Sequence, residues 1–116
     1  MKDLVFKFLN NRHGNNLKLI YRGQGKFGKE YELRDSLGYP MLVIFPNEGG
    51  TLSVLFMNKT IVTIKKWFGI SSVESNKYYT EWMISKTGYT KPSEMYKAAE
   101  EQYNVRYSEH ENDRVI

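Results

Sequence analysis

A group of cations surrounds the glycine-rich segment at residues 23–28, which is the part of the sequence most typical of a binding site. The group consists of Arg22, Lys26 and Lys29, with the ring of Phe27 among them. Cations beside an exposed aromatic ring suit contact with a phosphate, with single-stranded RNA or with an acidic protein surface. We therefore predict that these four residues bind an anion or a partner protein.

The spacing of the glycines in this segment resembles two phosphate-binding loops. Gly23, Gly25 and Gly28 match the G-x-G-x-x-G pattern of dinucleotide-binding folds and of protein kinases. A dinucleotide site needs a helix directly after the loop, whereas residues 29–33 alternate like a strand. A kinase needs a lysine on the third strand together with HRD and DFG motifs, and the chain has none of these. We therefore predict no nucleotide site and no cofactor.

Three lysines suggest an alternative interface with nucleic acid. Residues 64–70, followed by a helix start at Ser71, resemble part of a helix-turn-helix motif. Lys65 stands where that motif needs a small residue, and Ser75 stands where it needs a buried aliphatic one. A degenerate motif of this kind would place Lys65, Lys66 and Lys77 against phosphates.

Combinations of residues typical of catalysis or metal binding are few. His13 precedes a glycine at a predicted helix end, where a donor or cationic side chain is an ordinary cap. His110 lies among acidic residues in the C-terminal tail, which is a poor frame for a metal site. Glu30 and Glu32 have basic neighbours and suit ion pairing rather than proton transfer. We expect no enzyme, no catalytic residues and no metal.

Aromatic residues make up 15% of the chain and gather in its C-terminal part. Large, stiff and amphipathic rings anchor many protein interfaces. Tyr79 and Trp82 fall on a predicted buried stripe, whereas Tyr78, Tyr89 and Tyr96 lie at its edge. We predict that these last three tyrosines form a protein-contact patch.

The charge is divided unevenly along the 116 residues. The total is +4, but residues 1–34 carry +5 and residues 71–116 carry −2, so an orienting effect on a charged partner is expected.

There is no cysteine, which is typical of cytoplasmic proteins. The longest apolar run, residues 41–45, is too short to cross a bilayer, and no signal peptide is recognisable. We expect a cytoplasmic protein that does not bind membranes.

Local patterns predict one α+β domain at residues 1–104 and a charged, loosely ordered tail at 105–116. Along the chain, the domain is predicted to contain a short N-terminal helix, then a five-stranded antiparallel meander, and then two C-terminal helices packed on the sheet. The helices are predicted at residues 3–12, 71–86 and from Pro92, and the strands at 17–22, 30–34, 41–45, 51–57 and 60–66. The first helix and five strands resemble the order of Sm-like RNA-binding barrels, although no motif of that family is present.

The register of the first hairpin can also be predicted. Pairing Tyr21 with Tyr31 and Leu19 with Leu33 places apolar side chains on one face and sets Arg22 opposite Glu30. The central strands are apolar on both faces, so the second face needs cover from the C-terminal helices or from a second copy of the chain. A homodimer is therefore possible.

These patterns favour a non-enzymatic interaction protein that regulates or inhibits a partner protein by covering part of its surface. The partner's identity is not encoded in any motif. The small, cysteine-free composition resembles accessory proteins of bacteriophages and mobile elements that act on host factors. The alternative is nucleic-acid binding through the basic N-terminal hairpin or the degenerate helix-turn-helix.

Overall fold

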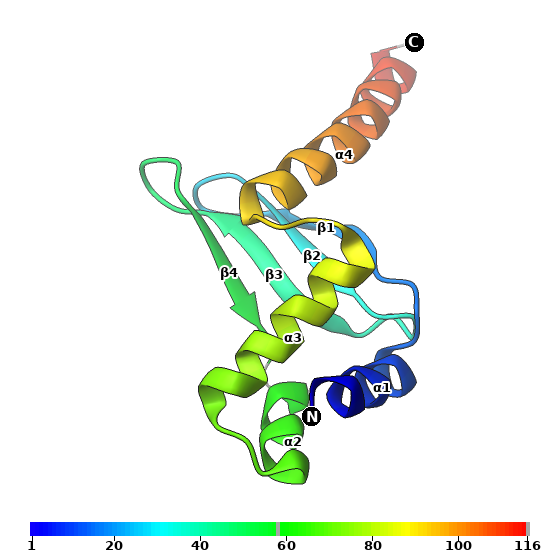
Figure 1. The fold of residues 1–116 in the computed structure, drawn as a ribbon. Coiled ribbons are helices and arrows are strands. Elements are labelled where there is room, and N and C mark those ends of the chain that lie inside the picture. Colours follow the sequence, from blue (N-terminus) through cyan, green and yellow to red (C-terminus); the bar gives the residue numbers. More distant parts are fainter. Residues whose placement is uncertain (58, 116) are drawn as a thin grey trace.

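The computed structural model describes the backbone of residues 1–57 and 59–115 and the side chains of residues 1–57 and 59–104. Helices pack on an antiparallel sheet, so the predicted α+β class is confirmed (Figure 1). The elements are α1 (Lys2–His13), β1 (Lys18–Gln24), β2 (Lys29–Arg34), β3 (Pro40–Pro46), β4 (Leu52–Phe56), α2 (Lys59–Phe68), α3 (Ser72–Thr87) and α4 (Pro92–Val115). The prediction of a charged, loosely ordered tail at 105–116 stays a prediction: the backbone of residues 105–115 belongs to α4, and the side chains of 105–116 lie outside the described residues. Within the described chain, each helix is too short or too polar to cross a membrane.

The sheet has four strands in the order β1-β2-β3-β4, and the prediction of a fifth strand at residues 60–66 is wrong. These residues belong to α2. A strand would place Val62 and Ile64 on one face, but Val62 is 59% exposed while Ile64 is fully buried. Ile61 and Ile64 instead share a helical face that packs into the core. The run of β-branched residues is compatible with either element, and packing against the core decides for a helix.

The first hairpin has the predicted register, with one local difference. Tyr21 pairs with Tyr31 and Leu19 pairs with Leu33, as expected. A β-bulge after Tyr21 then sets Gly23, and not Arg22, opposite Glu30. Arg22 Nε still lies 3.8 Å from Glu30 Oε1, so the expected ion pair forms despite the shift.

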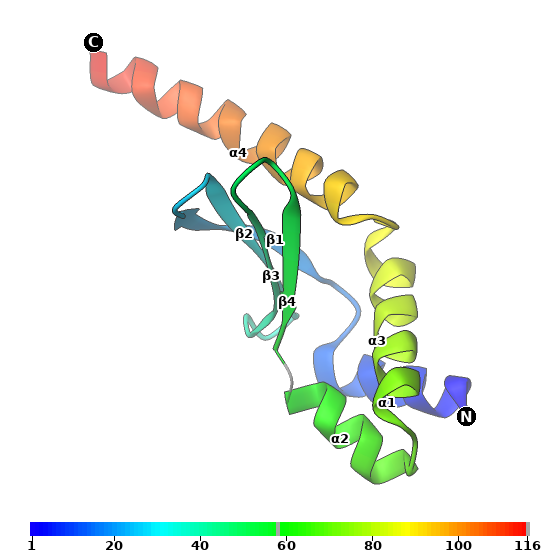
Figure 2. The same cartoon turned by 90° about the vertical axis from the view of Figure 1, so that its left-hand side faces the viewer.

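One face of the sheet packs against α3 and α4, which lie together on one side of it (Figure 2). Tyr31, Leu33 and Ile44 on this face are buried with Trp82 of α3 and Ala99 of α4. The opposite face carries a row that crosses all four strands and consists of Ile20, Glu32, Val43 and Leu55. Val43 is buried in this row while Leu55, on the edge strand, is 56% exposed.

The ends of α3 and α4 follow local sequence signals. The Ser71 hydroxyl accepts a hydrogen bond of 3.1 Å from the backbone N–H of Glu74, which is the predicted N-cap. Gly88 ends α3 in the left-handed conformation, with its N–H bonded to the carbonyl of Ile84. Pro92 is the first residue of α4, where its missing N–H costs nothing.

Helix α4 ties the first and last strands of the sheet together. It contacts both β1 and β4. The Tyr96 hydroxyl donates to the carbonyl of Lys29 at 2.8 Å, and the Tyr103 hydroxyl donates to the carbonyl of Leu19 at 2.7 Å. These bonds join α4 to β2 and β1 through side chains whose rings lie over the sheet.

Helices α1 and α2 lie side by side and run antiparallel. The Phe8 ring contacts Trp67 and Phe68 at the end of α2, with centroid distances of 5.1 and 5.9 Å. His13, the last residue of α1, bonds to Thr60 in the first turn of α2. The two helices are adjacent in both views (Figures 1 and 2). Residues about fifty positions apart in sequence thus form one surface.

Candidate functional site

The glycine-rich segment forms the tip of the β1–β2 hairpin, as its alternation predicted. Lys26 Nζ lies 5.3 Å from the centre of the Phe27 ring, and this ring is half exposed. Lys29 has a different environment, since its Nζ donates to Asn104 Oδ1 at 2.7 Å and its carbonyl accepts from Tyr96. Arg22 faces Glu30. Of the four predicted contact residues, Lys26 and Phe27 lie together at the tip, while Arg22 and Lys29 are held by neighbours.

The three predicted contact tyrosines lie in separate places. Tyr78 is in the second turn of α3, and Tyr89 follows the end of that helix, more than three turns away. Tyr96 packs edge-on against Tyr31 at 5.2 Å and bonds to Lys29, so it joins α4 to the hairpin. Among the described residues, no ring contact or hydrogen bond joins any two of these three tyrosines.

The three lysines of the alternative interface lie on consecutive helices. Lys65 and Lys66 are in the last turn of α2, and Lys77 is on the exposed side of α3. Residues 69–71 connect the two helices, and α2 contacts α3. A helix, a tight turn and a second helix are therefore present where the alternative interface needs them. Lys65 is exposed and Ser75 is buried at the positions that depart from the motif.

A group of exposed apolar and basic side chains lies on α1 and α2, and we call it the α1–α2 surface. Trp67 is 66% exposed although its ring contacts Phe8. On the same two helices, the exposed apolar residues are Met1, Leu4 and Val62, and the exposed cations are Lys2, Lys7, Arg12, Lys59, Lys65 and Lys66. Asp3 is the only acidic residue in the sequence of these two helices.

Most cations of this surface have no acidic partner among the described residues. Lys2 bonds to Glu81 of α3 at 2.9 Å. Arg12 lies 5.8 Å from the centre of the Phe8 ring and makes no ion pair with a described carboxylate. An exposed tryptophan on a helix pair that carries several unpaired cations is the composition expected of a binding surface for an acidic partner.

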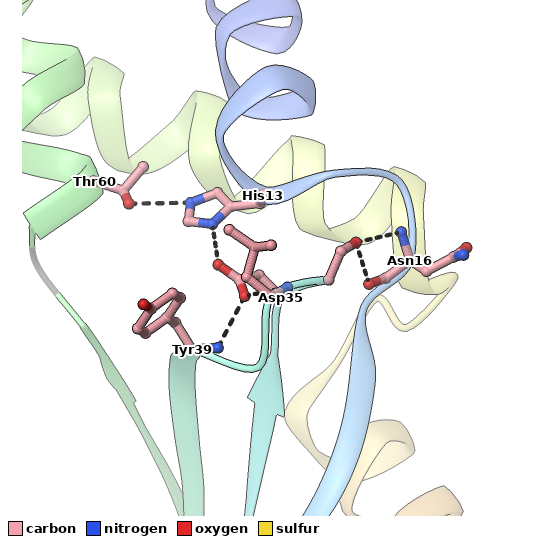
Figure 3. A network of polar contacts seen from close by, with 7 residues as sticks. His13, Asn16, Asp35, Tyr39 and Thr60 are labelled. Carbon is pink, nitrogen blue, oxygen red and sulfur yellow. Dashed lines mark hydrogen bonds and ion pairs between the residues drawn. The ribbon is translucent and has the colours of Figure 1, made fainter.

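A buried polar chain that the sequence did not reveal connects α1, the end of β2 and α2. His13 Nδ1 lies 3.0 Å from Asp35 Oδ2, and His13 Nε2 lies 3.0 Å from Thr60 Oγ1 (Figure 3). All three residues are buried. The backbone N–H groups of Leu37 and Tyr39 donate to Asp35 Oδ1, at 3.0 and 2.9 Å. His13 is therefore not an ordinary helix cap but the centre of a three-residue chain.

The charge states of this chain follow from its surroundings. Burial lowers the pKa of His13 below its ordinary value of 6.5, although Asp35 opposes this effect. Burial raises the pKa of Asp35, but hydrogen bonds from His13, Tyr39 and Leu37 outweigh it, so the net change is downward. At neutral pH we therefore expect a neutral imidazole beside an ionised carboxylate.

The polar chain of His13, Asp35 and Thr60 lies in the wall of a cavity of about 630 Å³. Its apolar wall includes Leu37, Pro40 and Met57. Arg12 and Lys59 also line it, at the adjoining ends of α1 and α2.

The described residues contain no cluster of three or more metal-ligand side chains. Comparison of the chain with protein-family models, with curated proteins and with solved structures finds no match.

Proposed function

We propose that the chain regulates or inhibits a partner protein by binding it through the α1–α2 surface. The observation that carries this proposal is the position of Trp67, which is 66% exposed yet held in place by Phe8. Tryptophan that is large, rigid and accessible contributes more binding energy than most side chains at protein interfaces. An exposed ring that is already ordered also loses little conformational entropy on binding.

The composition of the α1–α2 surface indicates the kind of partner. Leu4 and Val62 are more than half exposed, and aliphatic groups gain by contact with an apolar protein surface. Lys65 and Lys66 precede Trp67 in the sequence and suit acidic residues at the rim of an interface. The proposed partner therefore presents an apolar pocket bordered by acidic side chains.

Nucleic-acid binding is the second candidate, and the helix, turn and helix of α2 and α3 favour it. However, Glu74 lies in the first turn of α3, where the positive end of the helix would otherwise approach a phosphate. The sequence of α3 also balances Lys77 and Lys86 against Glu74 and Glu81. The unpaired cations instead share α1 and α2 with exposed aliphatic groups, which supports a protein partner.

Cross-linking at one defined position tests the proposal. A photoreactive amino acid at position 67 is expected to capture the partner in cells, whereas the same group at Thr80, on the exposed side of α3, should not. The captured protein is then purified, and its affinity is measured for the wild type, Trp67→Ala and Val73→Ala. Val73 is a matched control because it is 77% exposed and lies on α3.

We expect Trp67→Ala to weaken binding roughly 30-fold or more, which corresponds to about 2 kcal/mol. Val73→Ala should bind within about 2-fold of the wild type, as a surface substitution outside the interface. Lys65→Glu with Lys66→Glu should slow association, most strongly at low salt. Equal affinity of Trp67→Ala and the wild type would refute the proposal that the α1–α2 surface binds the partner. Tight binding to generic duplex DNA that disappears with added salt would favour the second candidate.

A further inference from the structure

The polar chain His13, Asp35 and Thr60 has the donor and acceptor order of a catalytic triad. Asp35 is a carboxylate and can only accept, so His13 Nδ1 carries the proton of their bond. His13 Nε2 is then an acceptor, and the Thr60 hydroxyl must donate to it across 3.0 Å. The hydroxyl proton therefore already points at a neutral imidazole whose far side is held by a carboxylate.

Tyr79 lies beside this polar chain. It is buried, and it lines the same cavity as His13, Asp35 and Thr60. Burial raises the pKa of Tyr79, so its phenol stays protonated. The proton order of the polar chain runs from Thr60 through His13 to Asp35, which leaves the lone pairs of Thr60 Oγ1 for reaction.

The cavity beside this chain limits what can reach Thr60. Its volume of about 630 Å³ is in the range of small-molecule sites. Met57 and Leu37 supply an apolar wall, and Arg12 and Lys59 supply positive charge. This combination suits a small compound with an apolar body and a negatively charged end.

We propose that this cavity is an acyl-transfer site that hydrolyses small anionic carboxylic esters, with Thr60 as nucleophile and His13 as general base. Asp35 is a positioning residue, because it touches His13 and fixes its tautomer. Arg12 and Lys59 hold the negative end of the ester. The proposed site lies at the opposite end of the helix pair from Trp67 and shares Arg12 and Lys59 with the α1–α2 surface. Its activity is measured without the partner and does not rest on the proposed partner binding.

The reaction closes with water as the only co-reactant. Thr60 Oγ1 attacks the ester carbonyl and forms a new C–O bond, while its proton passes to His13 Nε2. The bond to the leaving alcohol then breaks, and His13 returns that proton to the alcohol oxygen. Water attacks the acyl-threonine, gives its proton to His13, and releases the carboxylic acid as Thr60 regains a proton. The products are one acid and one alcohol.

The location of Thr60 supports this role. It lies in the first turn of α2, where backbone N–H groups have no partner within the helix. The positive end of the helix dipole favours the negative charge that develops on the carbonyl oxygen. The nucleophile and the stabilising dipole thus come from the same turn.

The test uses two nitrophenyl esters of similar size and the full-length chain. The 4-nitrophenyl monoester of glutaric acid is anionic, and 4-nitrophenyl butyrate is neutral. Wild type should hydrolyse the anionic ester faster and form an acyl adduct that peptide mass spectrometry places on Thr60. Thr60→Val should abolish both, whereas Thr60→Ser should retain them. Thr63→Val is the matched control, because Thr63 lies one turn further along α2 and bonds to the carbonyl of Lys59.

Two further variants separate catalysis from folding. His13→Gln should lower kcat by about 100-fold or more. Asp35→Asn should lower kcat with little change in KM, because the amide favours the tautomer whose Nε2 carries the proton. Thermal unfolding of each variant confirms that it is folded at the assay temperature. Val73→Ala should keep full activity, because Val73 is exposed on α3 and does not line the cavity. The assay contains no partner protein, so failure of partner binding leaves this result unaffected.

Three outcomes would overturn the proposal. The first is a wild-type rate no higher than that of buffer. The second is equal hydrolysis by Thr60→Val and Thr63→Val, which would make the activity a surface reaction of the protein. The third is an acyl adduct on lysine alone. In each case His13, Asp35 and Thr60 form a structural link between three elements and no active site.

Discussion

His13 Nδ1 and Asp35 Oδ2 lie 3.0 Å apart, and this contact joins the end of α1 to the turn after β2. Both side chains are buried, so they form few hydrogen bonds with water. A buried polar group that loses its partner is costly, because it keeps the cost of leaving water without the gain of a hydrogen bond. The position of α1 on the domain therefore depends on this pair.

Replacing Asp35 with asparagine tests that dependence. Asparagine keeps the size of the side chain and an acceptor for the N–H groups of Leu37 and Tyr39, but it lacks the charge that orients His13. We expect Asp35→Asn to lower the free energy of unfolding by about 1–3 kcal/mol in urea titrations. Asp3→Asn is the matched control on the exposed side of α1 and should change stability by less than about 0.5 kcal/mol.

The stability of the protein should fall as pH decreases below 6.5. Because the pKa of His13 is lowered in the folded state, the unfolded chain takes up a proton at this residue first. Its contribution is complete above 6.5 and is lost as pH falls from there toward the folded pKa. Asp35, whose pKa is also lowered, adds a loss in the same direction below its ordinary value of 3.8.

Urea titrations between pH 8 and pH 5 measure the contribution of His13. His13→Gln cannot titrate at this position, so its free energy of unfolding should vary less with pH than that of the wild type. Parallel pH profiles of the two proteins would show that His13 does not control this range.

Two glycines of the β1–β2 hairpin separate backbone strain from steric contact. Gly23 and Gly28 have φ angles of 149° and 150°, which side chains rarely adopt. A Cβ at position 28 would lie 2.8 Å from Pro46 Cγ, whereas a Cβ at position 23 has no described atom within 4 Å. Gly28→Ala should therefore destabilise the protein by about 1–3 kcal/mol more than Gly23→Ala. Equal unfolding midpoints would show that Pro46 moves aside.

The two tryptophans should differ sharply in their effect on stability. Trp82 is fully buried and its Nε1 donates to Asn10 Oδ1 at 2.9 Å. Trp82→Ala should cost about 3–5 kcal/mol. Trp67→Ala should cost at most about 1 kcal/mol, because this ring is mainly exposed and loses one aromatic contact. A large loss for Trp67→Ala in chemical denaturation would assign that side chain to the core.

Much of the fold could be predicted because its signals are local. Ser71 and Gly88 mark the ends of α3 through hydrogen bonds to nearby backbone groups, which the sequence displays directly. The pairing of Tyr21 with Tyr31 follows from the pleat, since a shift by one residue would move apolar side chains to the wrong face. These features need no knowledge of the rest of the molecule.

The remainder depends on contacts between distant segments. Residues 60–66 alternate like a strand, and only the burial of both Ile61 and Ile64 against the core decides for a helix. Thr60 is separated from His13 by 47 positions, so no spacing rule brings them together. The signal that was present, a histidine at a helix end, is equally typical of a simple cap. The polar chain therefore can be recognised only from the three-dimensional structure.

The order of the elements has a consequence for synthesis of the protein. All four strands precede α4, although Tyr96 and Tyr103 of that helix cover the rings of the sheet. A nascent chain that has emerged only as far as β4 therefore presents Tyr21 and Tyr31 to water. Exposed apolar surface on an unfinished domain promotes aggregation and attracts chaperones. We expect ribosome-bound intermediates that end between β4 and α4 to be the form that chaperones hold.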